Sequence, residues 1–475
     1  MTVDATDTAR DDAADARLAA DTLLSGGTLV TMDGRRRIIS DGALAFRGDR
    51  LVFVGKRIEA ERRVNARETI EASRFVITPG FIDAHIHITG DPLTRGYVPD
   101  EIEAGFGEKL TRWVIPRFEA HTAGDERLSA QFAALQMLKS GTTCFLEAGT
   151  IRHLDVVIEG LEGTGIRGRV GAWVEGRSND PASASAAIDT AIGLLEDEVA
   201  RYPADRGARI AAWPILIGHT TNPDEVWLAA KSLADTNAIG VSAHMSPHAS
   251  DAEWFLEHTG RRPISHLAGM GALGSNVSLT HAVHIDEEEL RCLADTETNV
   301  IHCSLAALRN ASGVTSAGLF PEMAEAGINL CLGTDGDMSD LTHTMKTAAA
   351  IFKDARRDAS VFSAYDTLTM ATLNAARALR LKHEIGSLEA GMKADFVLHD
   401  TDRPEWRPLL NVVNQLVNCA DGRGVHSVWV DGVRLVDNYR ATMLDEAALY
   451  ARAQSAGEAI AARSGVPMIC PWPVE

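Results

Sequence analysis

The sequence is poor in aromatic residues and has no long apolar run. Only 5% of its 475 residues are Phe, Trp or Tyr, and no apolar stretch is long enough to cross a membrane. A spanning helix needs about 20 such residues, so we expect no membrane partner. Residues 1–20 lack the apolar segment of a secretory signal, which favours a cytoplasmic location. The hydrophobic content of 45% still allows a large buried core.

Cysteine is scarce, and positive charge is in deficit. The six cysteines form no Cys-x-x-Cys pair, and without an export signal we expect them to be reduced thiols. The formal net charge of −20 would repel phosphate backbones, so we expect no nucleic-acid partner. Acidity of this kind is explained more simply by solubility than by a specific partner.

A nucleotide-binding glycine fingerprint is also missing. No Gly-x-Gly-x-x-Gly lies at a strand–helix turn, which argues against an open, doubly wound sheet. The central region instead contains eight apolar, β-branched runs, each followed by a helical pattern, and this repetition predicts a parallel (β/α)8 barrel. The runs are FIDAHIHI (81–88), TTCFLEA (142–148), GRVGAWVEG (168–176), ARIAAWPILIG (208–218), AIGVSAHM (238–245), VSLTHAVHI (277–285), NVIHCSL (299–305) and INLCLGTDG (328–336).

Short strands bounded by turns occupy both ends of the chain. GTLVTM, GALAFRG and RLVFVG precede the barrel, and ADFVLHD, VHSVWVDG and VRLVDN follow it. We therefore predict an α/β fold, a distorted TIM barrel with a small β-sandwich built from both chain ends. The expected ranges are an acidic, disordered tail (1–20), the first part of the sandwich (21–79), the barrel (80–385), and the second part with a C-terminal helix (386–475).

Histidine and aspartate gather at the predicted carboxyl ends of the barrel strands, where barrels place their active sites. His85 and His87 share one face of the first strand, because residues i and i+2 point the same way. His244 ends the fifth run, His281 lies in the sixth, and Asp335 ends the eighth. Imidazole nitrogens with one carboxylate are suitable ligands for zinc or a similar divalent ion.

Each of these residues has a plainer interpretation. A His-x-His pair alone is a weak signal, and Asp335 stands in GTDGD, a good turn sequence in its own right. His302 in the seventh run fits a buried structural histidine as well as a substrate contact, and His219 is equally ambiguous. The metal interpretation rests on several strands delivering such residues to one rim. No lysine ends the fourth run, so a carboxylated lysine bridging two metals is not supported, and we predict one ion.

The chain resembles the amidohydrolase superfamily, in the branch of triazine hydrolases and S-adenosylhomocysteine or methylthioadenosine deaminases. The matching segments extend over nearly all of the chain after the tail. They are VITPGFIDAHIH, LTRGY, LKSGTT, the His244 segment, GRRPISHLAGMGAL, LTHAVHI, VIHCSL, LGTDGDMSD, ATLNAARALRL and IGSLEAGMKADFVLHD.

The resemblance implies roles for particular residues. His85, His87, His244 and Asp335 match the family's metal ligands, and His281 matches the histidine beside the water nucleophile. Asp335 would also carry a proton from the water to the leaving group. The implied cofactor is one divalent ion, with zinc ahead of cobalt, iron or manganese. The implied partner is a small-molecule substrate, and we expect a homo-oligomer.

One departure from the family pattern bears on the substrate. The deaminase branch carries His-x-x-Glu at the fifth strand, whereas this chain reads His244-Met245-Ser246-Pro247, and proline has no acid–base group. His248 or His302 is a candidate for the missing proton transfer. A urea, carbamate, thiocarbamate or anilide has no ring nitrogen to protonate, so we predict hydrolysis of such an acyclic C–N bond, similar to phenylurea and molinate hydrolases.

Two other functions stay open at this point. One is a deaminase or chlorohydrolase acting on an aromatic N-heterocycle such as a triazine or an adenosine-type base. The other is a non-catalytic scaffold on the same fold, against which the complete set of predicted ligands argues. Neither the substrate nor the residue that replaces the glutamate follows from the sequence.

Overall fold

The computed structural model describes residues 17–97, 106–178, 180, 182–205, 207–218, 220–336 and 338–473. His219, one of the ambiguous histidines, lies outside these residues. Within the described part of the chain, no helix is both long enough and apolar enough to cross a membrane.

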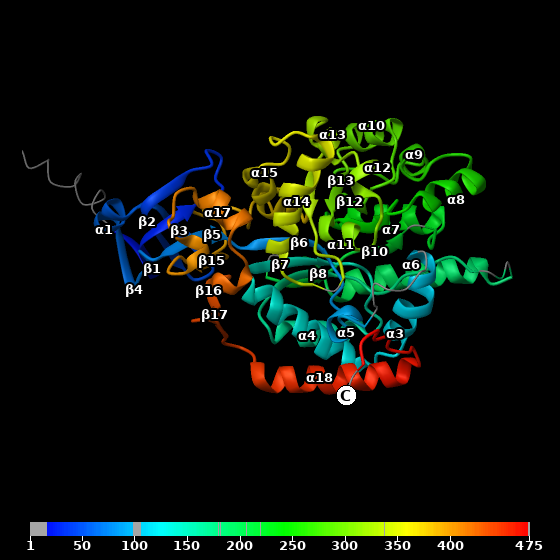
Figure 1. Cartoon of the computed structure of the whole chain (residues 1–475), viewed down its shortest axis with the longest axis horizontal. Helices are drawn as coiled ribbons and strands as arrows, with labels where there is room; N and C mark the ends of the chain where they lie inside the picture. The colour runs from blue at the N-terminus through cyan, green and yellow to red at the C-terminus, as the bar shows by residue number, and fades with distance from the viewer. Residues whose placement is uncertain are drawn as a thin grey trace, which may run out of the picture.

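Parallel strands form a barrel in the centre of the chain (Figure 1). Strands β6 to β9 pair in sequence order, and so do β10 to β14. Only Trp213 and Pro214 separate β9 from β10, so these two form the halves of one barrel strand, interrupted where Pro214 lacks a backbone donor. The strands are β6 (Phe81–Ile86), β7 (Thr142–Glu147), β8 (Arg167–Val170), β9 (Ile210–Ala212), β10 (Ile215–Gly218), β11 (Val241–Met245), β12 (Val277–His281), β13 (Asn299–His302) and β14 (Leu330–Leu332).

The barrel closes between its first and last strands. An isolated bridge pairs Ile86 with Asp335. The amide of His87 donates to the carbonyl of Asp335 at 3.2 Å, and the amide of Asp335 donates to the carbonyl of His85 at 2.9 Å. Gly333 permits this approach, because a Cβ there would lie 2.7 Å from the Cβ of His85. Together with the eight strand–helix units, this closure confirms the predicted distorted (β/α)8 barrel.

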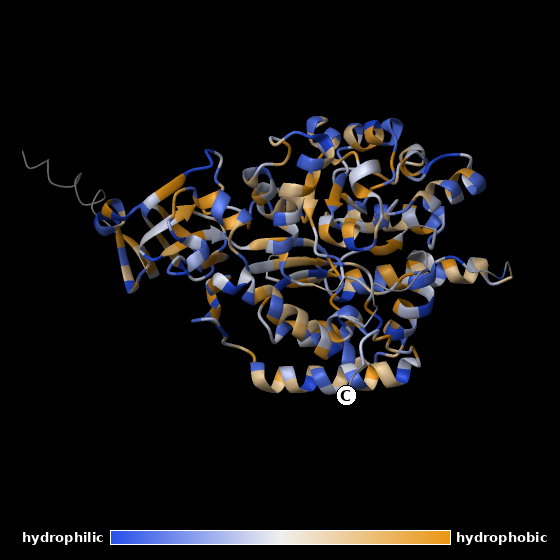
Figure 2. Cartoon of the chain, viewed as in Figure 1, coloured by the Kyte–Doolittle hydropathy of each residue, from blue (hydrophilic) through white to orange (hydrophobic). Residues whose placement is uncertain are grey.

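Helices surround the barrel, and the apolar side chains between helices and strands form its core. In Figure 2 the barrel strands are mostly orange, and the outer helices carry blue stretches. The helices between barrel strands are α2 (Phe106–Lys109), α3 (Ile115–Glu119), α4 (Ala123–Lys139), α5 (Leu154–Glu162), α6 (Ala184–Arg201), α7 (Asp224–Asn237), α8 (Ala249–Thr259), α9 (Pro263–Gly269), α10 (Glu287–Asp295), α11 (Ser304–Arg309), α12 (Val314–Ala317) and α13 (Phe320–Glu325). Those after the last barrel strand are α14 (Leu341–Arg356), α15 (Ala364–Thr369), α16 (Ala375–Ala378), α17 (Val412–Asn418) and α18 (Glu446–Ser464).

A second sheet draws its strands from both ends of the chain, as predicted. Its order is β18-β17-β16-β15-β5-β1-β2-β3, with β4 paired to β1 and the short helix α1 (Arg57–Arg63) joining β3 to β4. The strands are β1 (Leu18–Val30), β2 (Ile38–Arg47), β3 (Arg50–Lys56), β4 (Val64–Glu71), β5 (Phe75–Pro79), β15 (Phe396–Asp400), β16 (Val425–Val430), β17 (Val433–Asp437) and β18 (Arg440–Ala441).

Two segments differ from the expected ranges. Strand β1 begins at Leu18, inside the predicted tail, because Leu18 and Ala20 pair in parallel with Val64 and Ala66 of β4. The C-terminal helix α18 does not join the sheet domain. It packs against α4 of the barrel through an apolar cluster that includes Leu128, Leu135, Leu449 and Ile460, and Figure 1 shows it in red along that side.

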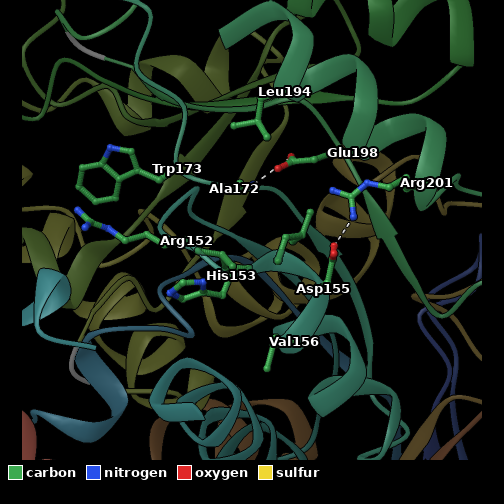
Figure 3. A pocket seen from close by; sticks show the side chains of 11 residues that line it. Arg152, His153, Asp155, Val156, Ala172, Trp173, Leu194, Glu198 and Arg201 are labelled. Carbon is green, nitrogen blue, oxygen red and sulfur yellow. Dashed lines mark hydrogen bonds and ion pairs between the residues drawn. The ribbon is translucent and has the colours of Figure 1, made fainter. Parts of the chain in front are cut away.

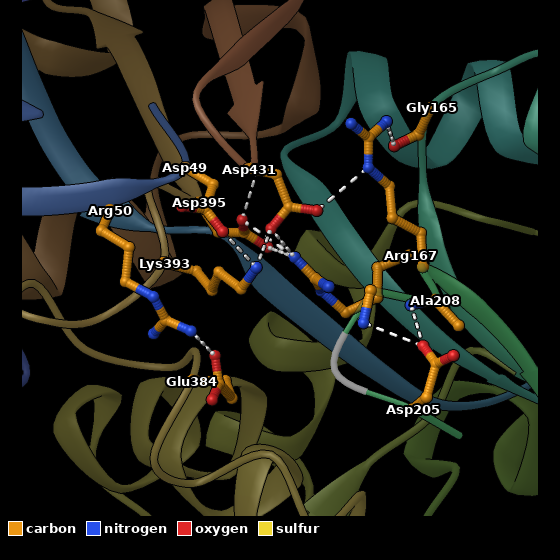
Figure 4. A network of polar contacts seen from close by, with 12 residues as sticks. Asp49, Arg50, Gly165, Arg167, Asp205, Ala208, Glu384, Lys393, Asp395 and Asp431 are labelled. Atoms are coloured by element: carbon orange, nitrogen blue, oxygen red, sulfur yellow. Dashed lines mark hydrogen bonds and ion pairs between the residues drawn. The ribbon is translucent and has the colours of Figure 1, made fainter. Parts of the chain in front are cut away.

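A buried polar network joins the barrel to the second sheet (Figure 4). The guanidinium of Arg167 on β8 lies 3.1 Å from Asp395 and 2.7 Å from Asp431, and both carboxylates belong to the C-terminal part of the chain. Lys393 lies 3.1 Å from Asp431 and 2.6 Å from Asp49. This network positions the barrel relative to the sheet but does not reach the strand ends that carry the histidines.

Candidate metal centre

Five predicted residues meet at the carboxyl end of the barrel. Ligand atoms of His85, His87 and His244 lie within 4.8 Å of one another, and so do those of His85, His281 and Asp335. His85 belongs to both groups, so the two groups form one site. The imidazole ring of His281 stacks on that of His244 with a centroid separation of 5.5 Å. The donor set is therefore nitrogen-rich with one carboxylate, the chemistry that a divalent transition metal prefers.

Hydrogen bonds orient two of the imidazoles. Nδ1 of His85 lies 3.0 Å from the hydroxyl of Thr280, and Nδ1 of His244 lies 2.8 Å from the carbonyl oxygen of Ile217. When Nδ1 is held by an outer partner, Nε2 is the nitrogen that the ring presents to a metal. Both rings are thus arranged as ligating histidines usually are.

The ionisable side chains of the site are buried and shift one another's pKa values. Burial alone would raise the pKa of Asp335, but the hydrogen bond from His87 and the surrounding imidazoles hold it well below its usual value. Burial alone would lower the pKa of His87, but the hydrogen bond to Asp335 and the nearby carboxylates raise it to about 9. In the protein without metal, a proton shared between Asp335 and the imidazoles therefore balances the carboxylate charge, which a bound cation would otherwise balance.

The backbone is unusual at the same strand ends. Non-glycine residues with positive φ include His281 (81°), Asp335 (65°) and Ser246 (51°). Such conformations cost about 1–3 kcal/mol each and are often found where a side chain must be aimed at a functional site. The backbone is also crowded at Gly218, because a Cβ there would lie 2.1 Å from the carbonyl oxygen of His244.

The two predicted proton carriers lie in different surroundings. His302 is fully buried, its ring centroid lies 3.9 Å from that of Phe320, and neither ring nitrogen has a hydrogen-bond partner among the described residues. Burial lowers the pKa of His302 to about 3, so its imidazole is neutral near neutral pH. His248 is half-buried directly after Pro247 and precedes the first turn of α8.

The sequence did not single out two further residues of the site. Thr280 holds His85, as described above, and lies one residue before His281 on β12. Glu147 ends β7 and is completely buried, with hydrogen bonds from Thr150 and from the amide of Gly149. Burial raises the pKa of Glu147 to about 7, although these hydrogen bonds oppose the shift. Its position at the carboxyl end of a barrel strand is the feature of the sequence that could have identified Glu147 as a site residue.

Comparison with known proteins gives the class that this fold and site define. Residues 76–435 match the amidohydrolase family, and the chain belongs to it. It is 31% identical over 420 residues to 5-methylthioadenosine/S-adenosylhomocysteine deaminase of Symbiobacterium thermophilum, covering 86% of this chain and 92% of that one. It is 29% identical to 5'-deoxyadenosine deaminase of Methanosarcina mazei, covering 94% and 99%. The chain is thus a hydrolase of carbon–nitrogen bonds other than peptide bonds.

Solved structures agree with this class. An adenosine deaminase from Xanthomonas campestris with bound zinc superposes with a TM-score of 0.84 at 26% identity, covering 94% of this chain and all of that one (100%). Atrazine chlorohydrolase from Arthrobacter aurescens with zinc gives a TM-score of 0.80 at 21% identity, covering 92% and 100%, which shows a shared fold alone. None of these relatives is a phenylurea or molinate hydrolase, so that narrower likeness stays a prediction.

Proposed function

We propose that this protein is a metal-dependent hydrolase that releases ammonia or another small leaving group from a ring carbon of an adenosine-type N-heterocycle. The observation that carries the proposal is similarity to adenosine-type deaminases over 86–94% of the chain, combined with a compact histidine–aspartate cluster at the barrel rim. This is the function that the sequence analysis held as its alternative, and it displaces acyclic C–N hydrolysis as the leading hypothesis.

We assign one divalent ion to the cluster, with His85, His87, His244 and Asp335 as its ligands. Zinc is the first choice, because nitrogen-rich sites with one carboxylate suit it and the Xanthomonas adenosine deaminase structure contains it. Cobalt, iron and manganese are compatible with the same donors. When bound, such an ion supplies Lewis acidity and lowers the pKa of a water toward about 7.

The protein's own residues then move the protons. Asp335 accepts a proton from the water nucleophile and returns it to the leaving group. His281 stacks on His244 and orients the nucleophile toward the ring carbon. His248 is our candidate for protonating the ring nitrogen, since it follows Pro247 at the end of the fifth strand. His302, whose buried ring lies against Phe320, is the alternative candidate for this proton transfer.

A second candidate function rests on Pro247. This buried proline occupies the position at which the deaminase motif has a glutamate, and it offers no proton to a ring nitrogen. A urea, carbamate or anilide needs no such proton, because only its departing amine must be protonated. Hydrolysis of an acyclic amide-type bond is therefore the alternative to test directly.

Product analysis distinguishes the two functions. Metal-loaded protein would be incubated with 5'-deoxyadenosine, an aminotriazine, an aryl urea and an aryl carbamate, and ammonia and amine release measured. We expect ammonia from the heterocycles and no cleavage of the acyclic compounds. Amine release from the urea or carbamate, without ammonia from any ring, would establish the second function instead.

A pair of variants tests the same point inside the protein. If ring protonation limits the rate, Pro247→Glu should raise deamination by at least about tenfold, since a placed general acid contributes roughly 10²–10⁴-fold. Pro247→Gln is the matched control, because it has the same shape without the acid and should show no such gain. An increase of similar size in both variants would argue against a proton-transfer role at this position.

Assembly and location also remain proposals. We expect a homo-oligomer, to be tested by light scattering. A reducing compartment such as the cytoplasm is supported by the six cysteines, none of which forms a disulfide. Three of them, Cys144, Cys303 and Cys331, are buried.

A further inference from the structure

A cavity of about 540 Å³ lies outside the barrel wall, between α5 and α6 (Figure 3). It contains none of the residues of the histidine–aspartate cluster. The loops after β7 and β8 form one side, and the two helices form the other. Its lining residues include Arg152, Asp155, Trp173, Leu194, Glu198 and Arg201.

Glu198 is the unusual group in this cavity. It is only 1% exposed, and one carboxylate oxygen accepts a hydrogen bond from the amide of Ala172 at 3.2 Å. The other oxygen, Oε1, has no hydrogen-bond partner in the described part of the chain. A buried carboxylate oxygen without a partner is costly, and native proteins usually satisfy such atoms.

The cationic side chains around the cavity already have other partners. Arg201 forms ion pairs with Asp155 and with Asp197, as Figure 3 shows for Asp155. Arg152 lies 3.6 Å from Glu119. Glu198 forms no ion pair among the described residues, and burial raises the pKa of its carboxyl to about 7, although the charge of Arg201 opposes the shift. A cation bound beside this carboxyl would favour its ionised form.

An aromatic wall stands across the cavity from this carboxylate. In Figure 3, Trp173 and Arg152 lie on one side and Glu198 on the other. The guanidinium of Arg152 lies 5.2 Å from the Trp173 ring centroid, so this indole already packs against one planar cation of the chain itself. Leu194 adds an apolar surface.

We propose that this cavity is a second binding site, which takes a small planar organic cation of the amidinium or guanidinium class with Glu198 as its anionic partner. The N–H groups of the cation donate to Oε1 of Glu198, and its flat body packs between Trp173 and Leu194. The site is independent of the metal centre and does not depend on which substrate the enzyme hydrolyses.

Benzamidine is the probe that tests this site on the metal-loaded protein. Isothermal titration calorimetry should show saturable binding of one benzamidinium per chain, and a crystal soaked with it should place the amidinium within hydrogen-bond distance of Glu198. Glu198→Gln should weaken binding about tenfold or more, because a charge-assisted hydrogen bond is lost. Benzamide, which has the same shape without the charge, should bind correspondingly weakly.

Matched variants exclude indirect effects. Glu196→Gln, an exposed carboxylate on the same helix, should leave the affinity for benzamidine unchanged. Leu194→Phe, which fills part of the cavity and keeps the carboxylate, should reduce it, and this variant serves if Glu198→Gln is poorly folded. Binding should persist in His244→Ala, which removes a proposed metal ligand. Absence of binding to the wild type, unchanged affinity in Glu198→Gln, or density for the probe only at the metal centre would overturn the proposal.

Discussion

Nε2 of His87 lies 3.0 Å from Oδ1 of Asp335, although the two residues follow the first and the last strand of the barrel. Backbone hydrogen bonds between the same two strands fix this contact, so it is a consequence of barrel closure. The predicted ligands therefore depend on the fold as a whole. They also sit at the rim, apart from the packed core, and can be altered without removing core side chains.

Replacing a proposed ligand should remove metal and activity but not the fold. His244→Ala should lower the catalytic rate by more than about a hundredfold, since activation of the water nucleophile depends on the ion. Bound metal should fall to a small fraction of one equivalent, as measured by elemental analysis. His258→Ala, an exposed histidine on α8, is the control and should retain both. A His244→Ala protein with normal metal content would exclude His244 as a ligand.

Thr280 should act through His85. Thr280→Val removes the hydroxyl that lies 3.0 Å from Nδ1 of His85 and keeps the side-chain shape. Loss of such an outer partner typically lowers metal affinity by about 10–100-fold. Competition with a fluorescent chelator measures the affinity, and Thr236→Val, on the exposed surface of α7, is the control. Equal affinities in the two variants would show that the hydroxyl does not support the site.

Gly218 should be required for the position of His244. Gly218→Ala introduces both a positive-φ strain (φ 81°) and a Cβ 2.1 Å from the carbonyl oxygen of His244. Gly260→Ala is a matched control, because its φ is also positive (73°) but no atom lies within 4 Å of the added Cβ. The control should cost about 1–2 kcal/mol in unfolding free energy. The Gly218 variant should cost more and also lose metal affinity, and similar behaviour of both variants would contradict this account.

The buried network around Arg167 should hold the barrel to the second sheet. Arg167→Met leaves Asp395 without its buried cation, while Asp431 keeps Lys393, and the change should lower the unfolding free energy by about 3–5 kcal/mol. Arg423→Met removes a partner of Asp421 whose side chain is 83% exposed, and no measurable change is expected. Urea denaturation of both variants measures the difference. Equal stability would mean that the network contributes little.

The barrel was predictable because its periodicity is local. Each of the eight apolar runs overlaps an observed strand, and their carboxyl ends carry His85, His244 and Asp335 as expected. The interruption at Pro214 was not predicted, since the run ARIAAWPILIG is apolar on both sides of it.

Contacts between distant strands were not predictable. The role of Thr280 depends on how β12 lies against β6, and no local pattern encodes that relationship. The early start of β1 depends likewise on pairing with β4, because Leu18–Ala20 have no distinctive pattern of their own. The position of α18 against α4 depends on tertiary packing through Leu449 and Ile460.

Stoichiometric metal titration tests the central claim most directly. Protein stripped with a chelator would be titrated with zinc while ammonia release from 5'-deoxyadenosine is followed. We predict no activity in the stripped protein and a linear rise that ends at one equivalent per chain. Full activity without metal, or a rise that continues to two equivalents, would contradict a single catalytic ion held by His85, His87, His244 and Asp335.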